Sequence, residues 1–263
     1  MNSKKKAERY WLDCLVRAHT SGTPIDSPAS LSGEISLDAA YAVQRQLVGK
    51  LLGPGDRITG WKVGATSRAV MSQLDIDEPI YGCMTSRSAV DGRDGIGLSS
   101  FCRLAVEPEI AIVIDKPLRG PGTTEADVMD AAAGAMAAVE LVDCRIKDWK
   151  ATPAEAIADN AFHAGIILGP LRKGLSGLDL VHEGVIMRKN GDLLGSACGV
   201  EALGSPLRVV AWLADKLSQY GLEIGAGQVV STGSLMPFHY VAPGDTVEVS
   251  YGALGKIQFS VGE

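Results

Sequence analysis

Two glutamates stand two residues apart in a segment rich in β-branched and apolar residues, Ala105–Asp115. Such a composition is typical of a β-strand, in which residues two apart share one face. Glu107 and Glu109 are therefore expected on the same face, about 6.6 Å apart at their Cα atoms, because two strand steps separate them. Both carboxylates can then reach one ion. The same spacing also fits two solvated side chains on an exposed face, so the rest of the chain must decide between these alternatives.

A third glutamate lies inside an apolar run. Residues 138–146 are expected to form a strand that buries Val139 and Leu141 and turns Glu140 to the other side. An unpaired buried charge is costly, so Glu140 must lie at an exposed edge, pair with another group or bind a metal. This constraint favours a site in which Glu140 meets Glu107 and Glu109.

Three carboxylates with no histidine or cysteine close by in the sequence suit a hard cation. Mg²⁺ and Mn²⁺ prefer oxygen ligands, whereas zinc prefers nitrogen and sulfur. Three ligands that each give one oxygen leave about three positions of an octahedral ion for water or substrate. A 2-oxo or 2-hydroxy acid can use two of them through its carboxylate and its 2-oxygen. The metal then acts as a Lewis acid when an enolate forms.

A lysine lies in a strand that glycines interrupt, Ile58–Gly64. Glycine in a strand often marks the close approach of another backbone or of a ligand. Lys62 shares a face with Gly60 and Gly64, which have no side chains to crowd it. It can add a second positive charge to the site or transfer a proton. The alternative is an ordinary exposed lysine.

The order of elements predicts an α+β protein. Apolar periodicity and turn residues divide it into an N-terminal helical part, residues 1–57, and a mixed, mostly antiparallel β-rich domain, residues 58–263. The expected helices are 5–19, 36–51, 67–74, from 123 or 124 to 137, a short helix after Pro153, and 206–220; the expected strands are 58–64, 105–115, 138–146, 165–169, 185–188, 193–195, 228–232, 246–251 and 256–261.

The composition excludes several classes of protein. The chain has 263 residues and a net charge of −6, and beyond Lys4–Lys6 it has no run of Lys and Arg, which argues against nucleic acid or an anionic membrane as partner. No apolar run approaches the roughly 20 residues of a membrane span. Five cysteines without a C-x-x-C pair, and no signal peptide, indicate reduced thiols in a soluble cytoplasmic protein.

Several short segments resemble one family in their order and spacing. The chain resembles the 2-oxopent-4-enoate hydratase and 4-oxalocrotonate decarboxylase family, within the fumarylacetoacetase-like fold, over almost its whole length. The matching segments are Gly60-Trp61-Lys62-Val63-Gly64-Ala65-Thr66-Ser67, Pro79-Ile80-Tyr81-Gly82, Glu107-Pro108-Glu109, Glu140–Trp149, Ala158-Asp159-Asn160-Ala161 and Thr232-Gly233-Ser234.

This resemblance implies a lyase of meta-cleavage aromatic catabolism that acts on 2-hydroxydienoates or their keto tautomers. It implies Mg²⁺ or Mn²⁺ held by Glu107, Glu109 and Glu140, and it places the family's lysine at Lys62. It also implies a homo-oligomer and complexes between related hydratases and decarboxylases. Within the matching segments we assign substrate binding to Gly64, Ser67, Asp159, Asn160 and Thr232.

Two positions depart from the family pattern. Ile80 stands where hydratases commonly carry an aspartate, as it does in the decarboxylases. Phe162 and His163 stand where the family usually has two serines. We predict that His163 replaces these hydroxyls as an acid–base group, because the intrinsic pKa of histidine lies near neutrality. Packing of the ring at the entrance of a strand is the alternative.

These observations leave several functions in competition. The leading hypothesis is hydration of a 2-oxo-4-enoate through a metal-bound enolate. Decarboxylation of a 2-oxo-3-enedioate is a close alternative, because it passes through the same enolate. An acylpyruvate-type C–C hydrolase comes third, since it needs a water-activating base for which His163 is the local candidate. A catalytically silent partner subunit is disfavoured by the presence of Lys62 and all three glutamates.

Overall fold

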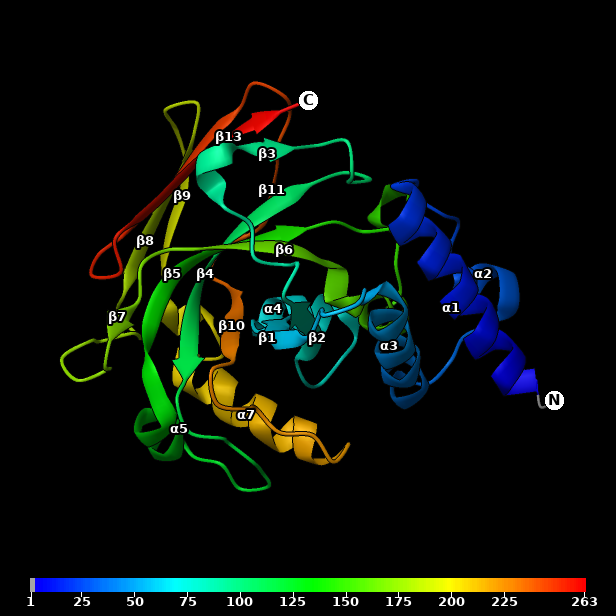
Figure 1. The fold of residues 1–263 in the computed structure, drawn as a ribbon, viewed down its shortest axis with the longest axis horizontal. Helices are drawn as coiled ribbons and strands as arrows, with labels where there is room; N and C mark the ends of the chain where they lie inside the picture. The colour runs from blue at the N-terminus through cyan, green and yellow to red at the C-terminus, as the bar shows by residue number, and fades with distance from the viewer. Residues whose placement is uncertain (1–2) are drawn as a thin grey trace.

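The computed structural model describes residues 3–263, which run from helices at the N-terminus into two β-sheets (Figure 1). Two predicted helices begin at serine caps: the hydroxyl of Ser36 accepts a hydrogen bond from the amide of Ala39, and that of Ser67 from the amide of Val70. None of the helices within residues 3–263 is both long and apolar enough to cross a membrane. The helices are α1 (Ser3–Ser21), α2 (Pro28–Ser32), α3 (Leu37–Leu51), α4 (Arg68–Leu74), α5 (Glu125–Ala131), α6 (Pro153–Ala158) and α7 (Pro206–Ser218), with 3-10 turns η1 (Gly92–Asp94), η2 (Lys147–Trp149), η3 (Asn160–Phe162) and η4 (Gly199–Glu201).

The larger sheet curls until its edges meet. Its order is β2-β1-β10-β4-β5-β6, with β11 on β4 and β7 on β5, and its pairings are antiparallel except that of β1 with β10. After β2, the backbones of Ser88 and Val90 bond to Ile166 in β6, which closes the sheet into a barrel. Its strands are β1 (Ile58–Gly64), β2 (Ile80–Thr85), β4 (Ala105–Ile114), β5 (Ala132–Val142), β6 (His163–Leu168), β7 (Arg172–Lys173), β10 (Val229–Ser234) and β11 (His239–Tyr240).

The smaller sheet packs against the barrel and carries the C-terminus (Figure 1). Its order is β3-β13-β12-β8-β9, and a turn at Asn190-Gly191 joins β8 to β9. The hydroxyl of Tyr251 links the two sheets, because it lies 2.7 Å from the carbonyl oxygen of Glu109 and 2.8 Å from that of Ala138. Its strands are β3 (Ile96–Gly97), β8 (Gly184–Lys189), β9 (Asp192–Cys198), β12 (Thr246–Tyr251) and β13 (Lys256–Gly262).

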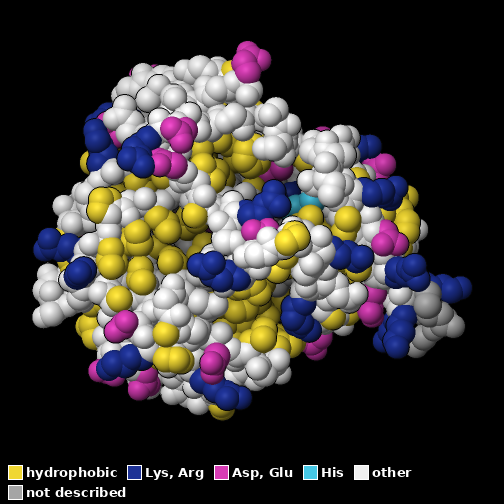
Figure 2. Space-filling model, in the orientation of Figure 1, with side chains coloured by type: hydrophobic (Ala, Val, Ile, Leu, Met, Phe, Trp, Pro, Cys, Tyr) yellow, Lys and Arg dark blue, Asp and Glu magenta, His cyan; other side chains and the backbone are white. Residues whose placement is uncertain are grey.

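The inner face of the barrel has its own small apolar cluster. Met84 of β2, Ala111 of β4, Ala138 of β5 and Ile166 of β6 contact one another although their strands are not all neighbours, so this face is concave. Alternation along β4 places Glu107 and Glu109 on the same face as Ala111. Half-buried apolar residues border the cluster, and Figure 2 shows hydrophobic side chains gathered over β4 and β5.

The N-terminal helices join the barrel through a shared core. The buried amide of Gln44 on α3 donates to the carbonyls of Tyr81 and Ile157, at 2.8 Å each. The ring of Tyr41 stacks on that of Tyr81, with ring centroids 4.4 Å apart. The overall α+β architecture is the predicted one, with helices first and mostly antiparallel sheets after them. The division at residues 57 and 58 stays a prediction.

One predicted boundary is wrong. The helix expected to reach residue 137 ends at Ala131, and β5 begins at Ala132 and ends at Val142, so the strand expected over 138–146 is displaced toward the N-terminus. The alanine-rich sequence favours helix locally, but pairing with β4 along its whole length overrides that preference. Gly134 interrupts the alanines where β7 comes close, because a Cβ there would lie 2.1 Å from the carbonyl oxygen of Arg172.

Gly60→Ala should destabilise the barrel. A Cβ at this position would lie 2.1 Å from the carbonyl oxygen of Val229 and 2.8 Å from Cε of Met84, so β1 and β10 would have to separate. Overpacking of this kind costs about 1–3 kcal/mol of unfolding free energy. Gly49 on α3 is the matched control, because an added Cβ meets nothing within 4 Å, and Gly49→Ala should gain about 0.5–1 kcal/mol. Urea unfolding measures both variants; wild-type stability of Gly60→Ala would contradict the close approach.

Candidate metal centre

The three glutamates meet on the inner face of the barrel. Glu107 of β4 is directly opposite Glu140 of β5 in the sheet register, and Glu109 is two residues further along β4. One oxygen from each carboxylate lies within 4.8 Å of the other two. Glu109 and Glu140 are fully buried, whereas Glu107 is half-buried. The structure therefore brings together the residues that the sequence analysis expected to converge.

Burial and mutual repulsion oppose ionisation of this cluster. Burial, followed by the charge of Glu140, raises the pKa of Glu107 and of Glu109 to about 8. Burial also raises the pKa of Glu140, although the nearby Lys62 acts in the opposite direction. A bound cation would compensate these charges, and metal binding would then release protons from the carboxyl groups.

The donor atoms fit a hard divalent cation. Oε2 of Glu109 accepts hydrogen bonds from the hydroxyl of Ser231 at 2.5 Å and the amide of Gly233 at 3.0 Å. Oε1 of Glu109 has no hydrogen-bond partner among the described residues, whereas Oε2 of Glu140 lies 3.1 Å from the ammonium of Lys62. Buried polar atoms normally have a partner, so the unpaired Oε1 of Glu109 is an oxygen available to a ligand. A donor set made only of carboxylate oxygen suits Mg²⁺ or Mn²⁺.

Lys62 places a positive charge beside the carboxylates. Its Nζ lies 3.1 Å from Oε2 of Glu140 and donates a hydrogen bond to the carbonyl of Ala161 at 2.9 Å. Burial acts to lower the pKa of Lys62, but the three carboxylates outweigh it and raise the pKa above its ordinary value. Gly64 leaves space for the ammonium, because a Cβ there would lie 3.4 Å from Nζ. The lysine is therefore a protonated group of the site.

His163 contacts one of the three glutamates. Its Nδ1 lies 2.7 Å from Oε1 of Glu140. Burial, and then the charges of Lys62 and Arg145, lower the pKa of His163 well below its ordinary value, so the ring is neutral. A neutral ring that faces a carboxylate carries its proton on Nδ1, which leaves the lone pair on Nε2. Nε2 has no partner among the described residues, and the acid–base role of His163 stays a prediction.

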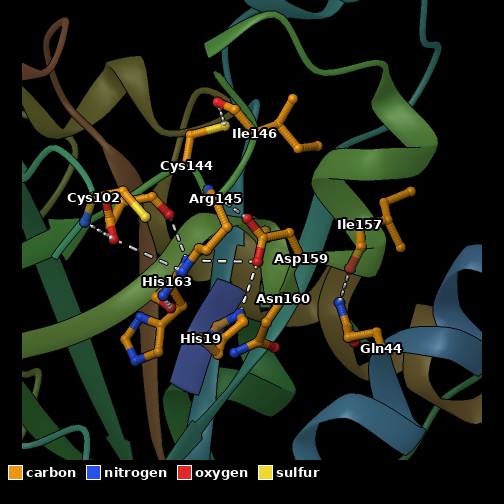
Figure 3. Close-up of polar contacts among 12 residues, drawn as sticks. His19, Gln44, Cys102, Cys144, Arg145, Ile146, Ile157, Asp159, Asn160 and His163 are labelled. Atoms are coloured by element: carbon orange, nitrogen blue, oxygen red, sulfur yellow. Dashed lines mark hydrogen bonds and ion pairs between the residues drawn. The ribbon is translucent and has the colours of Figure 1, made fainter. Parts of the chain in front are cut away.

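Asp159 and Asn160 hold the backbone around the site (Figure 3). Oδ2 of the fully buried Asp159 accepts a hydrogen bond from the amide of Arg145 at 3.0 Å, and Oδ1 lies 2.8 Å from Nε2 of His19. Asn160 accepts from the amide of Cys83 at 2.7 Å and donates to its carbonyl at 2.9 Å. Both side chains bond to the protein itself, and their predicted role in substrate binding stays a prediction.

The other assigned residues lie in different surroundings. Ser67 caps α4, and the hydroxyl of Thr232 donates to the carbonyl of Ile110 at 2.8 Å. Of the five residues assigned to substrate binding, Gly64 lies beside the ammonium of Lys62. The roles of Ser67 and Thr232 in substrate binding stay predictions.

Two residues that contribute to the site had no role in the sequence analysis. Ser231 bonds to Glu109, and its position on the inner face follows from the register of β10 with β4, in which it is opposite Ala111. A polar residue in an apolar strand was a signal, but the pairing of segments so far apart in the chain was not visible. Arg145 donates from Nη2 to the carbonyl of His163 at 2.9 Å and so fixes the start of β6.

A cavity of about 540 Å³ adjoins the site, because His163, whose ring contacts Glu140, is one of its lining residues. Its lining includes Cys83 and Thr85, which alternate along β2 with the inner-facing Gly82 and Met84. The glutamates do not line this cavity within the described residues. Of the three glutamates, the half-buried Glu107 is the most exposed.

Metal should stabilise the protein more at higher pH. Because the pKa values of Glu107 and Glu109 are raised from 4.5 to about 8, the metal-free folded chain holds protons in that range that the unfolded chain has lost. The contribution of this centre to the unfolding free energy therefore falls as pH rises from about 4.5 to about 8. A bound cation replaces the protons and so prevents this fall in stability. The gain in Tm on adding Mn²⁺ to chelator-treated protein should be larger at about pH 8 than at about pH 5.

The comparison is made at equal pH with and without metal, so that titrating groups elsewhere in the chain cancel. Replacing Glu107 and Glu109 together with glutamine should abolish the Mn²⁺ shift. A shift of equal size at both pH values would mean that these carboxylates ionise freely without a cation.

Comparison with known proteins agrees with this geometry. The family model described as fumarylacetoacetate (FAA) hydrolase C-terminal matches residues 55–262. The chain is 36% identical over 251 residues to TodF product hydratase of Pseudomonas putida, and the match covers 95% of this chain and 94% of that protein. It is 35% identical over 224 residues to 4-oxalocrotonate decarboxylase of Pseudomonas putida, and the match covers 85% of each of the two chains.

A solved structure extends the likeness to the whole fold. The structure of 4-oxalocrotonate decarboxylase from Pseudomonas putida G7, complexed with magnesium and adipate, has a TM-score of 0.93 and 32% sequence identity, and the match covers 99% of both chains. These matches confirm the resemblance inferred from the sequence motifs. The chain belongs to the fumarylacetoacetate hydrolase family, in the group of hydratase and decarboxylase relatives.

Proposed function

We propose that the chain is a divalent-metal-dependent lyase that hydrates a 2-hydroxydienoate, or its 2-oxo-4-enoate tautomer, in the meta-cleavage catabolism of aromatic compounds. The observation that carries the proposal is the cluster of Glu107, Glu109 and Glu140 with the ammonium of Lys62 on one inner face of the barrel. The names of the relatives support it, since they include TodF product hydratase and 2-hydroxypent-2,4-dienoate hydratase.

The side chains of the site suit the development of negative charge on a substrate oxygen. Mg²⁺ or Mn²⁺ held by the three glutamates would supply Lewis-acid stabilisation of that charge. Lys62 adds a protonated ammonium, whose position is fixed by the carbonyl of Ala161. His163 orients Glu140 through Nδ1. The lone pair on its unpaired Nε2 can accept a proton from water.

Decarboxylation of a 2-oxo-3-enedioate is the second candidate, and one residue favours it. Ile80 of β2 is buried opposite Gly64 in the register, on the side where Lys62 lies. An apolar side chain there can neither donate nor accept a proton, which a hydration requires more than a decarboxylation does. 4-Oxalocrotonate decarboxylase is among the relatives. The acylpyruvate-type hydrolase and the silent partner subunit are less favoured alternatives.

One assay separates these functions. The purified protein with Mg²⁺ is incubated with 2-hydroxydienoates and with oxalocrotonate, while ultraviolet absorbance and evolved CO₂ are followed. Loss of dienoate absorbance without CO₂ is the expected result, and CO₂ from the diacid would favour the decarboxylase. No turnover of any of these acids, alone or with a related partner enzyme, would exclude both. The homo-oligomer, and a complex with a related hydratase or decarboxylase, stay predictions that sedimentation can test.

Glu109→Gln should abolish metal-dependent turnover and leave the fold intact. The amide keeps the volume of the side chain but removes a ligand charge, and removal of one buried carboxylate also relieves repulsion, so the unfolding free energy should not fall. Turnover at limiting Mn²⁺ and urea unfolding are the two measurements. Glu201→Gln, at an exposed glutamate, is the control. Equal activity of Glu109→Gln and wild type at limiting metal would contradict the role of Glu109.

Lys62→Met should lower kcat by about 10²–10³-fold, the usual effect of removing one group that stabilises transition-state charge. Methionine keeps the length of the side chain in its buried position, so loss of packing is small. The dissociation constant for Mn²⁺, measured by titration, should change much less than kcat. If metal binding fell while kcat held, Lys62 would be a structural group of the metal centre instead.

A further inference from the structure

Four aromatic side chains gather at one end of the barrel. We call Trp149, Phe162, Phe238 and Tyr240 the aromatic rim. The ring of Trp149 is central, because its centroid lies 4.8 Å from that of Phe238, 5.6 Å from that of Phe162 and 5.7 Å from that of Tyr240. Phe238 and Tyr240 also meet edge to face, with centroids 5.3 Å apart. These distances are those of contacting aromatic pairs.

The sheet register places the aromatic rim beside the glutamates. Tyr240 of β11 is directly opposite Ala105 of β4, and opposite residues of paired strands share a face. Ala105 precedes Glu107 by two residues, so Tyr240 projects on the side of Glu107, about 7 Å along the strand. The amide of Leu235 donates to the carbonyl of Pro108, which holds the segment leading to Phe238 against this part of β4.

The other side of the aromatic rim adjoins the second glutamate strand. Phe162 directly precedes His163, whose ring contacts Glu140, and its carbonyl accepts a hydrogen bond from the amide of Asp143 just after β5. The aromatic rim therefore spans the end of the barrel where β4 begins, β5 ends and β6 begins. Both Glu107 and Glu140 lie two residues from this end.

Exposure shows which side of the centre a ligand can reach. Glu109, Glu140, Lys62 and His163 are buried, and only Glu107 of the three glutamates is half-buried. Trp149, Phe162 and Tyr240 are half-buried too, and Phe238 is exposed, at 38%. A molecule that approaches Glu107 from this end of the barrel therefore passes the partly exposed rings of the aromatic rim, of which Tyr240 is covered on one face by Arg103.

We propose that the aromatic rim receives the tail of the substrate and selects a planar apolar substituent, such as a phenyl or conjugated alkenyl group, over a short or carboxylated tail. This inference rests on the proposed function, because it places the 2-oxo acid group at the three glutamates. An acid bound there extends its far end past Glu107 onto the rings. The guanidinium of Arg103 lies 3.7 Å over the ring of Tyr240, so the flat face of the guanidinium already packs against the rim.

Binding of saturated 2-oxo acids tests the inference without turnover. The probes are 2-oxopentanoate, 5-phenyl-2-oxopentanoate and 2-oxohexanedioate, each titrated calorimetrically into protein saturated with Mn²⁺. The phenyl acid should bind about tenfold more tightly than 2-oxopentanoate, because ring contacts of this kind are worth about one decade in affinity. The diacid should show no such gain.

Phe238→Ala should reduce the preference for the phenyl acid from about tenfold toward onefold, because it removes the exposed ring of the rim. Phe238→Leu, which keeps an apolar side chain, should give an intermediate ratio and guards against a folding defect in the alanine variant. Tyr10→Ala is the matched control, since Tyr10 lies on α1 and is 37% exposed. It should leave the preference unchanged.

Three results would overturn the inference. Equal binding of 2-oxopentanoate and the phenyl acid, with the unsubstituted dienoate still turned over, would reject the aromatic rim and leave the proposed function standing. Tightest binding of the diacid, lost in Arg103→Gln, would make the rim a carboxylate site. Failure of every 2-oxo acid to bind, together with no turnover of any dienoate, would reject the proposed function and the rim with it.

Discussion

The register between β4 and β5 is the constraint on which the site depends. It sets Glu107 directly across from Glu140, although like charges opposite each other destabilise a sheet. A slip of one residue would turn every side chain of β4 to the other face, so the glutamates would enter the apolar core outside the barrel. The apolar residues of both strands exclude that slip. The hydrophobic pattern of the two strands therefore holds the three glutamates close together against the mutual repulsion of their charges.

The segment from Asp159 to His163 transmits this constraint to the other groups. Asn160, Ala161 and Phe162 all have left-handed backbone angles, with φ of 54°, 51° and 61°, which non-glycine residues rarely adopt. The side chains of Asp159 and Asn160 keep the segment in that shape through bonds to Arg145 and Cys83. As a result the carbonyl of Ala161 faces Lys62, and the ring of His163 faces Glu140. Backbone strain of this kind commonly occurs at functional sites.

Much of this arrangement was predictable from local patterns, because alternation and burial act over a few residues. The shared face of Glu107 and Glu109, the cost of burying Glu140 and the cap at Ser36 follow from such patterns. The boundary at Ala131 was not predictable, since pairing with β4 outweighs the helix preference of alanine. Ser231 and Arg145 were missed because their roles depend on contacts between segments distant in the chain. Pairing across such distances leaves no trace in the order of residue types.

The hydroxyl of Tyr251 connects the smaller sheet to the two strands that carry the glutamates. It lies within hydrogen-bonding distance of carbonyl oxygens on both β4 and β5, at Glu109 and at the residue paired with it, Ala138. The separation of the two acidic strands is therefore braced by a residue of the smaller sheet. Substitutions in the smaller sheet can accumulate freely on its solvent side, whereas its contact at Tyr251 couples that sheet to the spacing of the acids. The relative positions of the glutamates therefore depend on both sheets and not on the barrel alone.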